Sequence, residues 1–338
     1  MAYLYEMNET MVDKLCLGAA MLGSGGGGEP LIEQQVLENL FRTTKKTVKV
    51  IDVSMLANDA LILPVCYMGA PSVMQENLPC LNGFLDIIRL TEEKYSKVAA
   101  ISAGEIGGAN ALIPLIVSLV TDLPVVDGDL VGRAFPELSM SSANIGKDPL
   151  LPTAIIAGMK GECEVITTKD AFMLEETCRN ICIDNGSASA LGLYPMSAKV
   201  FEKKAILGSM SHAIQIGGLL SEKKLPTDGE LICSGYIRSI KSEISDGFLI
   251  GQIEVQSGKK IYSISLQNEY MALNHNKSII AQAPEIISLI DAETYSPISS
   301  ESVYFGQEVV LYVLPAPKIW KSKDALKLLN LDHKESDL

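Results

Sequence analysis

Apolar residues near the start of the chain recur at the spacing of two amphipathic helices. The apolar positions are Met11, Leu15, Ala19 and Leu22 in the first helix, and Leu31, Ile32, Val36, Leu37 and Leu40 in the second. The first helix is expected over residues 11–22, with Thr10 as its N-cap and Asp13 as the capping-box partner. A glycine-rich run at 23–28 ends this helix, because glycine is unfavourable in a helix interior. Pro30 suits the first turn of the second helix.

The following segments alternate between strand and helix patterns. Apolar runs rich in β-branched residues predict strands at 47–53, 60–68, 97–103 and 124–127. Helix-like stretches lie between them at 83–95 and 107–119. Strands that alternate with helices favour a mainly parallel sheet with helices on its faces.

The pattern changes near residue 160. Two long helical segments are expected at 169–183 and 197–219. Strand-like segments follow at 231–240, 247–256, 259–267 and 307–314. The change from alternating elements to a β-rich region indicates a second domain.

We therefore predict an α/β protein of two domains. A mainly parallel α/β sheet domain is expected over 1–162, and a helix-plus-β-rich domain over 163–320. A polar tail at 321–338 follows, in which residues 325–331 have the pattern of a short helix.

Composition and charge narrow the functional classes. The chain has 338 residues, of which 47% are hydrophobic, and a formal net charge of −13. This charge argues against nucleic acid and anionic membranes as partners, because both would repel the protein. Residues 1–10 do not resemble a signal peptide, and polar and proline residues interrupt the apolar stretch at 111–126. Seven cysteines scattered over the chain suit a reducing compartment, so a cytoplasmic location is expected.

The glycine-rich run is a candidate binding loop. Gly23, Gly25 and Gly28 match the dinucleotide-binding fingerprint in spacing, and Asp52 lies at a suitable distance beyond them. That fingerprint needs a preceding strand, whereas a helix is expected here, so neither a nicotinamide nor a flavin cofactor is expected. Free amides before a helix suit a carboxylate, a phosphate or an oxyanion. The expected substrate-binding residues of this loop are Gly25, Gly26, Gly27, Gly28 and Glu29. The alternative is a tight turn between packed helices.

Two polar segments follow predicted strands, where ligands bind in α/β sheets. The first contains Glu105 and Asn110, and the alternative role for such residues is helix capping. The second contains Asp127 and Asp129, which would point to one side of an extended chain.

Close carboxylates can serve as acid and base or hold a cation, so Asp127, Asp129 and Glu105 are the candidate catalytic residues. Farther along the second segment, Arg133 could clamp a substrate carboxylate, and Glu137 is a further candidate substrate contact. The alternative is a solvated loop with an internal ion pair.

Metal-binding patterns are weak. The three histidines, His212, His275 and His333, are far apart, and Cys178 and Cys182 lie one helical turn apart, a spacing that also suits a buried helix face. Cys66 lies near the end of a predicted strand. Its thiol could therefore be a nucleophile, a metal ligand or a buried core side chain. The candidate ligands of a divalent metal such as zinc are Asp127, Asp129, Cys66 and His212.

Several ordered blocks resemble the S-methyl thiohydantoin desulfurase-like family, first described as a domain of unknown function. The blocks are residues 18–30, 69–73, 107–111, 123–137, 267–269 and 297–313. The block 267–269, Gln-Asn-Glu, is polar between apolar strands. We expect it either to face the ligand-binding cleft or to mark the end of a strand. The sequence departs from the family pattern with Ser24 for threonine, Glu29 for aspartate and Leu130 for a glycine.

The resemblance implies an α/β N-terminal half, a β-rich C-terminal half and hydrolytic loss of methanethiol from an S-methyl thiohydantoin. It also implies dependence on zinc and association with hydantoinase-type or oxoprolinase-type proteins. A small molecule is the expected substrate, and a second copy of the chain or a hydantoinase-type protein is the expected protein partner.

Our first hypothesis is a hydrolase in which water attacks the ring carbon between the two nitrogens. A carboxylate, or a metal held by carboxylates, would activate the water, and Arg133 would orient an acidic substrate group. The alternative is a non-catalytic ligand-binding or accessory subunit. A nucleotide-binding enzyme is the third option, and a helix before Gly23 would exclude it.

Overall fold

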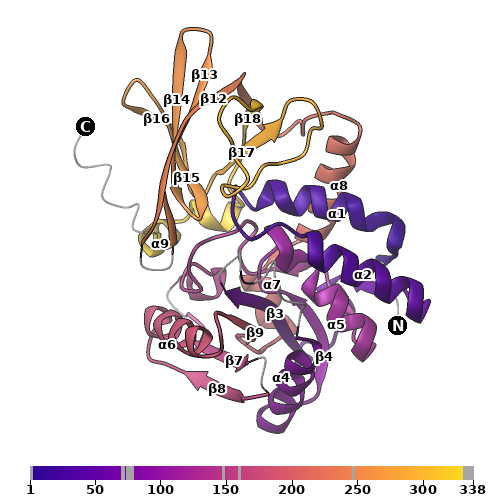
Figure 1. The fold of residues 1–338 in the computed structure, drawn as a ribbon. Coiled ribbons are helices and arrows are strands. Elements are labelled where there is room, and N and C mark those ends of the chain that lie inside the picture. The colour runs from indigo at the N-terminus through magenta and orange to yellow at the C-terminus, as the bar shows by residue number, and fades with distance from the viewer. Residues whose placement is uncertain are drawn as a thin grey trace.

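The computed structural model of the protein contains two large β-sheets with helices packed around them (Figure 1). A small two-stranded sheet is formed by β6 (Gly128–Asp129) and β11 (Ile206–Leu207). The structure describes residues 3–69, 73, 80–146, 149–158, 161–245 and 248–329. Residues 70–72 of the block at 69–73, and the expected tail beyond residue 329, lie outside the described residues. Figure 1 shows the first sheet in the lower part of the molecule and the second, orange sheet in the upper part.

The first sheet has nine strands in the order β1-β2-β5-β4-β3-β9-β7-β8, with β10 paired to β3. The bounds are β1 Tyr5–Met7, β2 Val48–Ile51, β3 Leu61–Gly69, β4 Val98–Ala103, β5 Val125–Val126, β7 Thr153–Ala157, β8 Cys163–Thr167, β9 Ala188–Leu193 and β10 Met196–Ser197. Strands β2, β5, β4 and β3 run parallel, and the remaining pairs are antiparallel. The predicted α/β fold with parallel strands is therefore confirmed, with antiparallel strands added at both sides.

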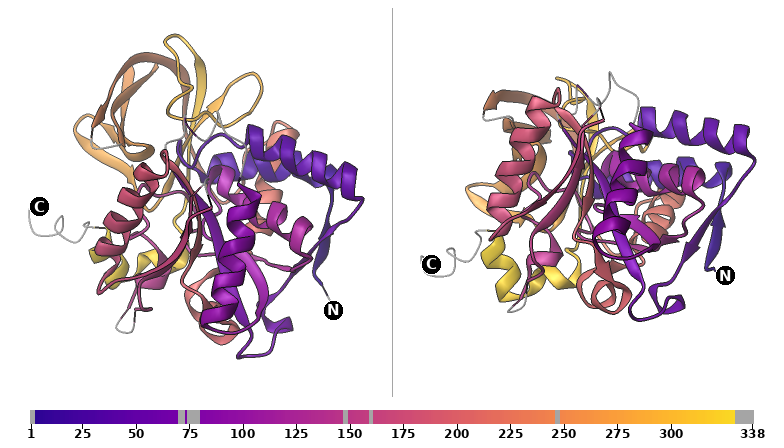
Figure 2. Two further views of the ribbon diagram at one scale, coloured as in Figure 1. Left: turned by 60° about the horizontal axis from the view of Figure 1, so that its bottom comes forward. Right: turned by 90° about the horizontal axis from the view of Figure 1, so that it is seen from below.

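Helices cover both faces of this sheet (Figure 2). The bounds are α1 Glu9–Leu22, α2 Leu31–Thr44, α4 Leu81–Lys94, α5 Ile113–Thr121, α6 Ala171–Asp184, α7 Ala198–Lys204, α8 Ser209–Ser221 and α9 Lys323–Leu328. Along β3, Leu61, Leu63 and Val65 join the hydrophobic cluster of α1, α2, α4 and α5. Ile62, Cys66 and Met68 join the cluster of α6 on the other face. Successive side chains of a strand point to opposite faces, so a strand buried on both is apolar throughout.

The second sheet has seven antiparallel strands in the order β16-β15-β14-β13-β12-β18-β17. The bounds are β12 Glu230–Ser245, β13 Phe248–Ser257, β14 Lys260–Gln267, β15 Glu269–His275, β16 Ser278–Gln282, β17 Ile286–Asp291 and β18 Glu308–Leu314. Strands β12, β13, β14 and β18 correspond to the four strands expected from the sequence. The predicted helix-plus-β-rich second half is confirmed.

Helix ends differ from the sequence predictions in three places. Asn8, rather than Thr10, caps α1, because its Oδ1 accepts the Thr10 N–H at 3.0 Å. The helix expected over 197–219 is interrupted: α7 is followed by the short strand β11 (Ile206–Leu207) and by Gly208 with φ +76° before α8 begins. The helix expected over 107–119 begins instead as a 3-10 turn, Gly108–Ala111, before α5.

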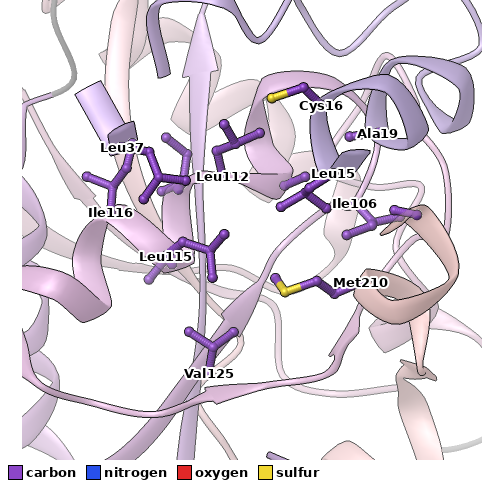
Figure 3. Packing of buried hydrophobic residues seen from close by; sticks show 14 of the residues in the cluster. Leu15, Cys16, Ala19, Leu37, Ile106, Leu112, Leu115, Ile116, Val125 and Met210 are labelled. Carbon is purple, nitrogen blue, oxygen red and sulfur yellow. The ribbon is translucent and has the colours of Figure 1, made fainter. Parts of the chain in front are cut away.

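Helices α1 and α8 pack closely although they are far apart in the sequence. A Cβ atom added at Gly18 of α1 would overlap the carbonyl of Ala213, and one added at Gly217 of α8 would overlap the carbonyl of Lys14. Figure 3 shows Leu15 and Ala19 of α1 near Ile106, and Met210 of α8 in the same cluster. Glycine on both helices therefore allows their backbones to touch.

The first sheet takes strands β8, β9 and β10 from beyond residue 162, so the domain boundary placed there stays a prediction. Near the C-terminus, Trp320 is fully buried and its Nε1 donates to the carbonyl of Val131 at 2.7 Å, which anchors the segment before α9. Among the described residues, none of the helices combines the length and the hydropathy that crossing a bilayer requires.

Candidate active site

A cavity of about 300 Å³ lies where the glycine loop, the ends of β3 and β4, and the start of β15 meet. Its wall includes the glycine loop, together with Cys66 and Asn110. The ionisable carboxylates in the wall are Glu29, Glu105, Glu137, Glu175, Glu269 and Glu301. The predicted loop residues and Glu105, Asn110 and Glu137 are therefore brought together around one space.

The glycine loop is shaped by its contacts with both halves of the molecule. Gly25, Gly27 and Gly28 have φ values of +84°, +74° and +76°, a backbone region that residues other than glycine rarely adopt. A Cβ atom at Gly26 would overlap the Glu269 carboxylate, and one at Gly27 would lie 2.6 Å from the carbonyl oxygen of Gly107. The run of glycines thus serves close backbone packing as well as the cavity wall. The helix that precedes it excludes the dinucleotide-binding reading.

Glu105 follows the end of β4 and faces the cavity. Its Oε1 accepts the Asn110 Nδ2–H at 3.3 Å, and its Oε2 accepts the Phe135 N–H at 3.1 Å. Asn110 is itself fixed to β3, because its Oδ1 accepts the Tyr67 N–H at 2.7 Å and its Nδ2 donates to the Tyr67 carbonyl at 3.2 Å. Burial first, and the nearby Glu269 carboxylate second, raise the pKa of Glu105 to about 8.

Glu269 begins β15 and enters the cavity from the second sheet. Its side chain is 3% exposed, and within the described part of the chain its Oε2 has no hydrogen-bond partner. Burial raises the pKa of Glu269 to about 7, while Arg133 and the main chain of Gly27 act in the opposite direction. Two glutamates from different sheets therefore titrate near neutral pH in one cavity.

Arg133 lies behind the cavity wall rather than in it. Its Nε donates to the carbonyl of Ala134 at 2.8 Å and its Nη1 to that of Glu285 at 2.6 Å, and the guanidinium lies 4.6 Å from the Phe135 ring centroid. Burial lowers the pKa of Arg133 to about 10. Its charge acts on Glu269 from inside the protein, so this geometry lends no support to a direct clamp on a substrate carboxylate.

Asp127 and Asp129 are also outside the cavity wall. Asp127 binds the start of α8, where its Oδ1 accepts the N–H groups of Met210 at 2.9 Å and Ser211 at 3.2 Å. The Ser211 hydroxyl donates to its Oδ2. These contacts correspond to the capping role of a carboxylate at a helix N-terminus.

The carboxylate of Asp129 organises the chain around it. Its Oδ2 accepts main-chain N–H groups from Ile106 at 3.0 Å, Val131 at 3.0 Å and Gly132 at 2.7 Å. Burial raises the pKa of Asp129 to about 6, against the effect of these hydrogen bonds. The contacts of both aspartates are those of residues that hold the loop, and neither carboxylate lines the cavity.

An alanine at position 127 tests the capping role. We expect Asp127→Ala to lower the free energy of unfolding by about 1–2 kcal/mol, the usual effect of losing a helix cap. Chemical denaturation of the variant measures this loss. Asp127→Asn keeps an acceptor oxygen and should lose less. If Asp127→Asn retained its full stability but lost ligand turnover altogether, the residue would have a chemical role that its position does not indicate.

The four candidate metal ligands do not form a metal centre in this structure. Cys66 lies in the cavity wall, where burial raises the pKa of its thiol, while His212, Asp127 and Asp129 are not in that wall. Across the described ranges, no group of three or more His, Cys, Asp or Glu side chains is arranged to hold a metal ion. These donors do not fit a zinc site, and we assign no step to a metal.

Sequence reasoning did not name Glu175, Arg179 or Glu301, although all three line the cavity, and it named Glu269 only within the block 267–269, without a role. The polar block 267–269 was a signal for Glu269, because a charged residue between apolar strands is unusual. Glu175 and Arg179 lie one turn apart on α6, a pattern also found on solvated helices. Glu301 lies within the block 297–313, which the family resemblance marked without indicating a role for this residue.

Comparisons with known proteins agree with this architecture. A family model described as "S-Me-THD-like, N-terminal domain" matches residues 10–168, and one described as "S-Me-THD-like, C-terminal domain" matches residues 169–333. The chain therefore belongs to the S-Me-THD-like family. The fold is similar to a crystal structure of a protein from Chromobacterium violaceum, with a TM-score of 0.81 and 24% sequence identity over 96% of this chain and 95% of that one. None of the curated proteins matches the chain.

Proposed function

We propose that the cavity is the active site of a hydrolase that removes the methylthio group from an S-methyl thiohydantoin or a related five-membered ring. The observation that carries the proposal is the presence of Glu105 and Glu269 in one cavity, with pKa values raised to about 8 and about 7. Two carboxyl groups with different pKa values can divide the roles of acid and base. The higher pKa of Glu105 suits the role of proton donor, and the lower pKa of Glu269 suits the role of base.

In the proposed mechanism the electrophile is the ring carbon between the two nitrogens, which carries the sulfur. Ionised Glu269 takes a proton from water while the water oxygen bonds to this carbon. Protonated Glu105 gives its proton to the ring nitrogen of the carbon–nitrogen double bond. The result is a neutral tetrahedral adduct that carries a hydroxyl and a methylthio group.

Collapse of this adduct completes the reaction. The carbon–sulfur bond breaks, and the proton held by Glu269 passes to sulfur, so methanethiol leaves. The hydroxyl proton of the adduct returns to Glu105, and the water oxygen remains as a ring carbonyl. The product is a hydantoin, and both glutamates regain their starting protonation states.

Three further features support the proposal. The cavity of about 300 Å³ is at the small end of ligand pockets, which suits a single small ring. The hydrogen bonds that join Asn110 to Tyr67 and Glu105 restrict the position of the proposed acid. The family description refers to S-Me-THD-like proteins, and the sequence resemblance implies the same ring chemistry.

Turnover is tested directly with S-methyl thiohydantoins bearing different side chains. We expect release of one thiol per ring, detected with a chromogenic disulfide reagent. In water labelled with heavy oxygen, mass spectrometry should find one labelled atom in the hydantoin product. Repeating the assay after chelation tests the zinc dependence that the resemblance implies. Tight binding of hydantoins without thiol release would contradict the hydrolase and favour the ligand-binding or accessory role.

A further inference from the structure

The charges around the cavity are strongly unbalanced. Six glutamates line it, Arg179 is the cation in the described part of its wall, and the buried Arg133 acts on Glu269 from behind the wall. Arg179 is already paired, because its Nε donates to Glu175 Oε1 at 2.6 Å and its Nη2 donates to the Pro136 carbonyl at 3.2 Å. The other carboxylates of the wall have no ion-pair partner among the described residues at salt-bridge distance.

Glu29 and the exposed Glu301 both line the end of the cavity formed by the glycine loop and residues 299–301. The Ser299 hydroxyl donates to Glu29 Oε1 at 2.7 Å, and the Ser302 hydroxyl donates to the same oxygen. Burial, followed by the charge of Glu29, raises the pKa of Glu301, which places the two carboxylates within electrostatic reach of each other. The serine contacts hold Glu29 in place but bring no positive charge.

Main-chain contacts join this end to Glu269, one member of the proposed catalytic pair. Ser300 links the two places, because its N–H donates to the Gly25 carbonyl at 2.7 Å and its hydroxyl donates to the Asn268 carbonyl at 2.5 Å. The next residue, Glu269, is buried, and its carboxylate lines the same cavity. The Oε2 atom of this carboxylate has no hydrogen-bond partner among the described residues. A buried acceptor without a partner, with the Glu105 carboxylate nearby, is costly unless a donor from a ligand completes it.

We propose that the end of the cavity between Glu29 and Glu301 is a subsite for a positively charged substrate side chain, an ammonium or a guanidinium. The inference rests on the proposed function, since it names the substrate class of the same cavity. The ring would lie between Glu105 and Glu269, and its side chain would extend along the glycine loop. This reverses the sequence expectation that Arg133 selects an acidic side chain.

Binding measurements by titration calorimetry test the subsite without requiring turnover. The probes are hydantoins that carry the side chains of arginine, norleucine and glutamate, and butylguanidinium, which has no ring. We expect the arginine-type hydantoin to bind at least about tenfold more tightly than the norleucine type, the effect of one charge-assisted hydrogen bond. The glutamate type should bind most weakly.

Variants assign the preference to the two carboxylates. Glu29→Gln and Glu301→Gln should each reduce the affinity for the arginine type by about tenfold and leave the norleucine type unchanged. Glu176→Gln is the matched control, because Glu176 is an exposed glutamate of α6 outside the cavity wall. Equal binding of the arginine and norleucine types, or a preference that survives in both cavity variants, would overturn the subsite.

The ring-free probe separates the two proposals. If butylguanidinium binds and loses affinity in Glu29→Gln while no hydantoin binds, the cationic subsite stands and the thiohydantoin reaction falls. If thiol is released equally from substrates with neutral and cationic side chains, the reaction is supported and the cationic subsite is contradicted. Competition of a divalent metal ion with butylguanidinium at Glu29 and Glu301 would assign this end to a metal ion and overturn the proposal.

Discussion

Glu269→Gln is expected to reduce kcat/KM for thiol release by about 10²–10⁴-fold, the usual contribution of a general base. Glutamine has nearly the same shape and fits against Gly26, but it cannot take a proton from water. The neighbouring Arg133 keeps its hydrogen bonds to the carbonyls of Ala134 and Glu285, so the fold should persist. Steady-state kinetics with a saturable substrate, together with a thermal melt, separates the loss of activity from a loss of stability.

The pH profile gives this prediction a second readout. Glu269 acts as the ionised base, so activity should fall as the pH decreases through about 7. Glu105 acts as the protonated acid, so activity should also fall as the pH rises through about 8. The parent enzyme should therefore show a bell-shaped kcat/KM profile, and the residual activity of Glu269→Gln should lose the limb at low pH.

Glu105→Gln is the complementary variant, in which the limb at high pH should disappear. Glu176→Gln, with the same change of charge on the exposed side of α6, should keep the parent profile. A Glu269→Gln enzyme within about threefold of the parent at every pH would remove Glu269 from the mechanism, because a general base contributes far more than that.

Gly217→Ala should lower the free energy of unfolding by about 3 kcal/mol, at the upper end of typical overpacking effects. The added methyl group would overlap the Lys14 carbonyl of α1, and a backbone atom cannot move aside as a flexible side chain can. The two helices would have to separate, which would disturb the cluster that contains Leu15 and Met210 (Figure 3). Denaturant unfolding monitored by circular dichroism measures the loss.

The neighbouring glycine provides a matched control. A Cβ atom at Gly218 would lie 3.8 Å from the Lys14 side chain, which is an ordinary contact. Gly218→Ala should therefore stabilise the protein by about 0.5–1 kcal/mol, because alanine is the better helix former. If the two variants shifted the unfolding midpoint alike, the close approach of α1 and α8 would be wrong.

Much of the fold could be predicted because the sequence carries a local signal for it. The apolar runs of β3 and β4 and the amphipathic pattern of α1 and α2 identify these elements without long-range information. Strand β9 was missed because its sequence, Ala-Ser-Ala-Leu-Gly-Leu, has no β-branched residue and becomes a strand by pairing with β3 and β7. Pairing with strands that are distant in the sequence makes this segment a strand, and no local sequence pattern encodes that pairing.

The candidate site was predictable to a similar extent. The positions of Glu105 and Asn110 after a parallel strand placed them at the carboxyl edge of the sheet, and the cavity contains both. The same argument applied to Asp127 and Asp129, but their carboxylates turn to main-chain N–H groups. Sequence position cannot distinguish a carboxylate that faces a ligand from one that caps a neighbouring helix. For Glu269 the sequence left a position in the cleft and a strand end open, and only the contact between the two sheets places it in the cavity.

The close contact between α1 and α8 also has a consequence for synthesis of the protein. Helix α1 leaves the ribosome early, but its partner α8 begins only at Ser209. At roughly 5–20 residues per second, the ribosome needs about 10–40 s to add the intervening residues. During that interval the surface around Gly18 is exposed on the nascent chain, so we expect chaperones to bind this helix until α8 has been translated.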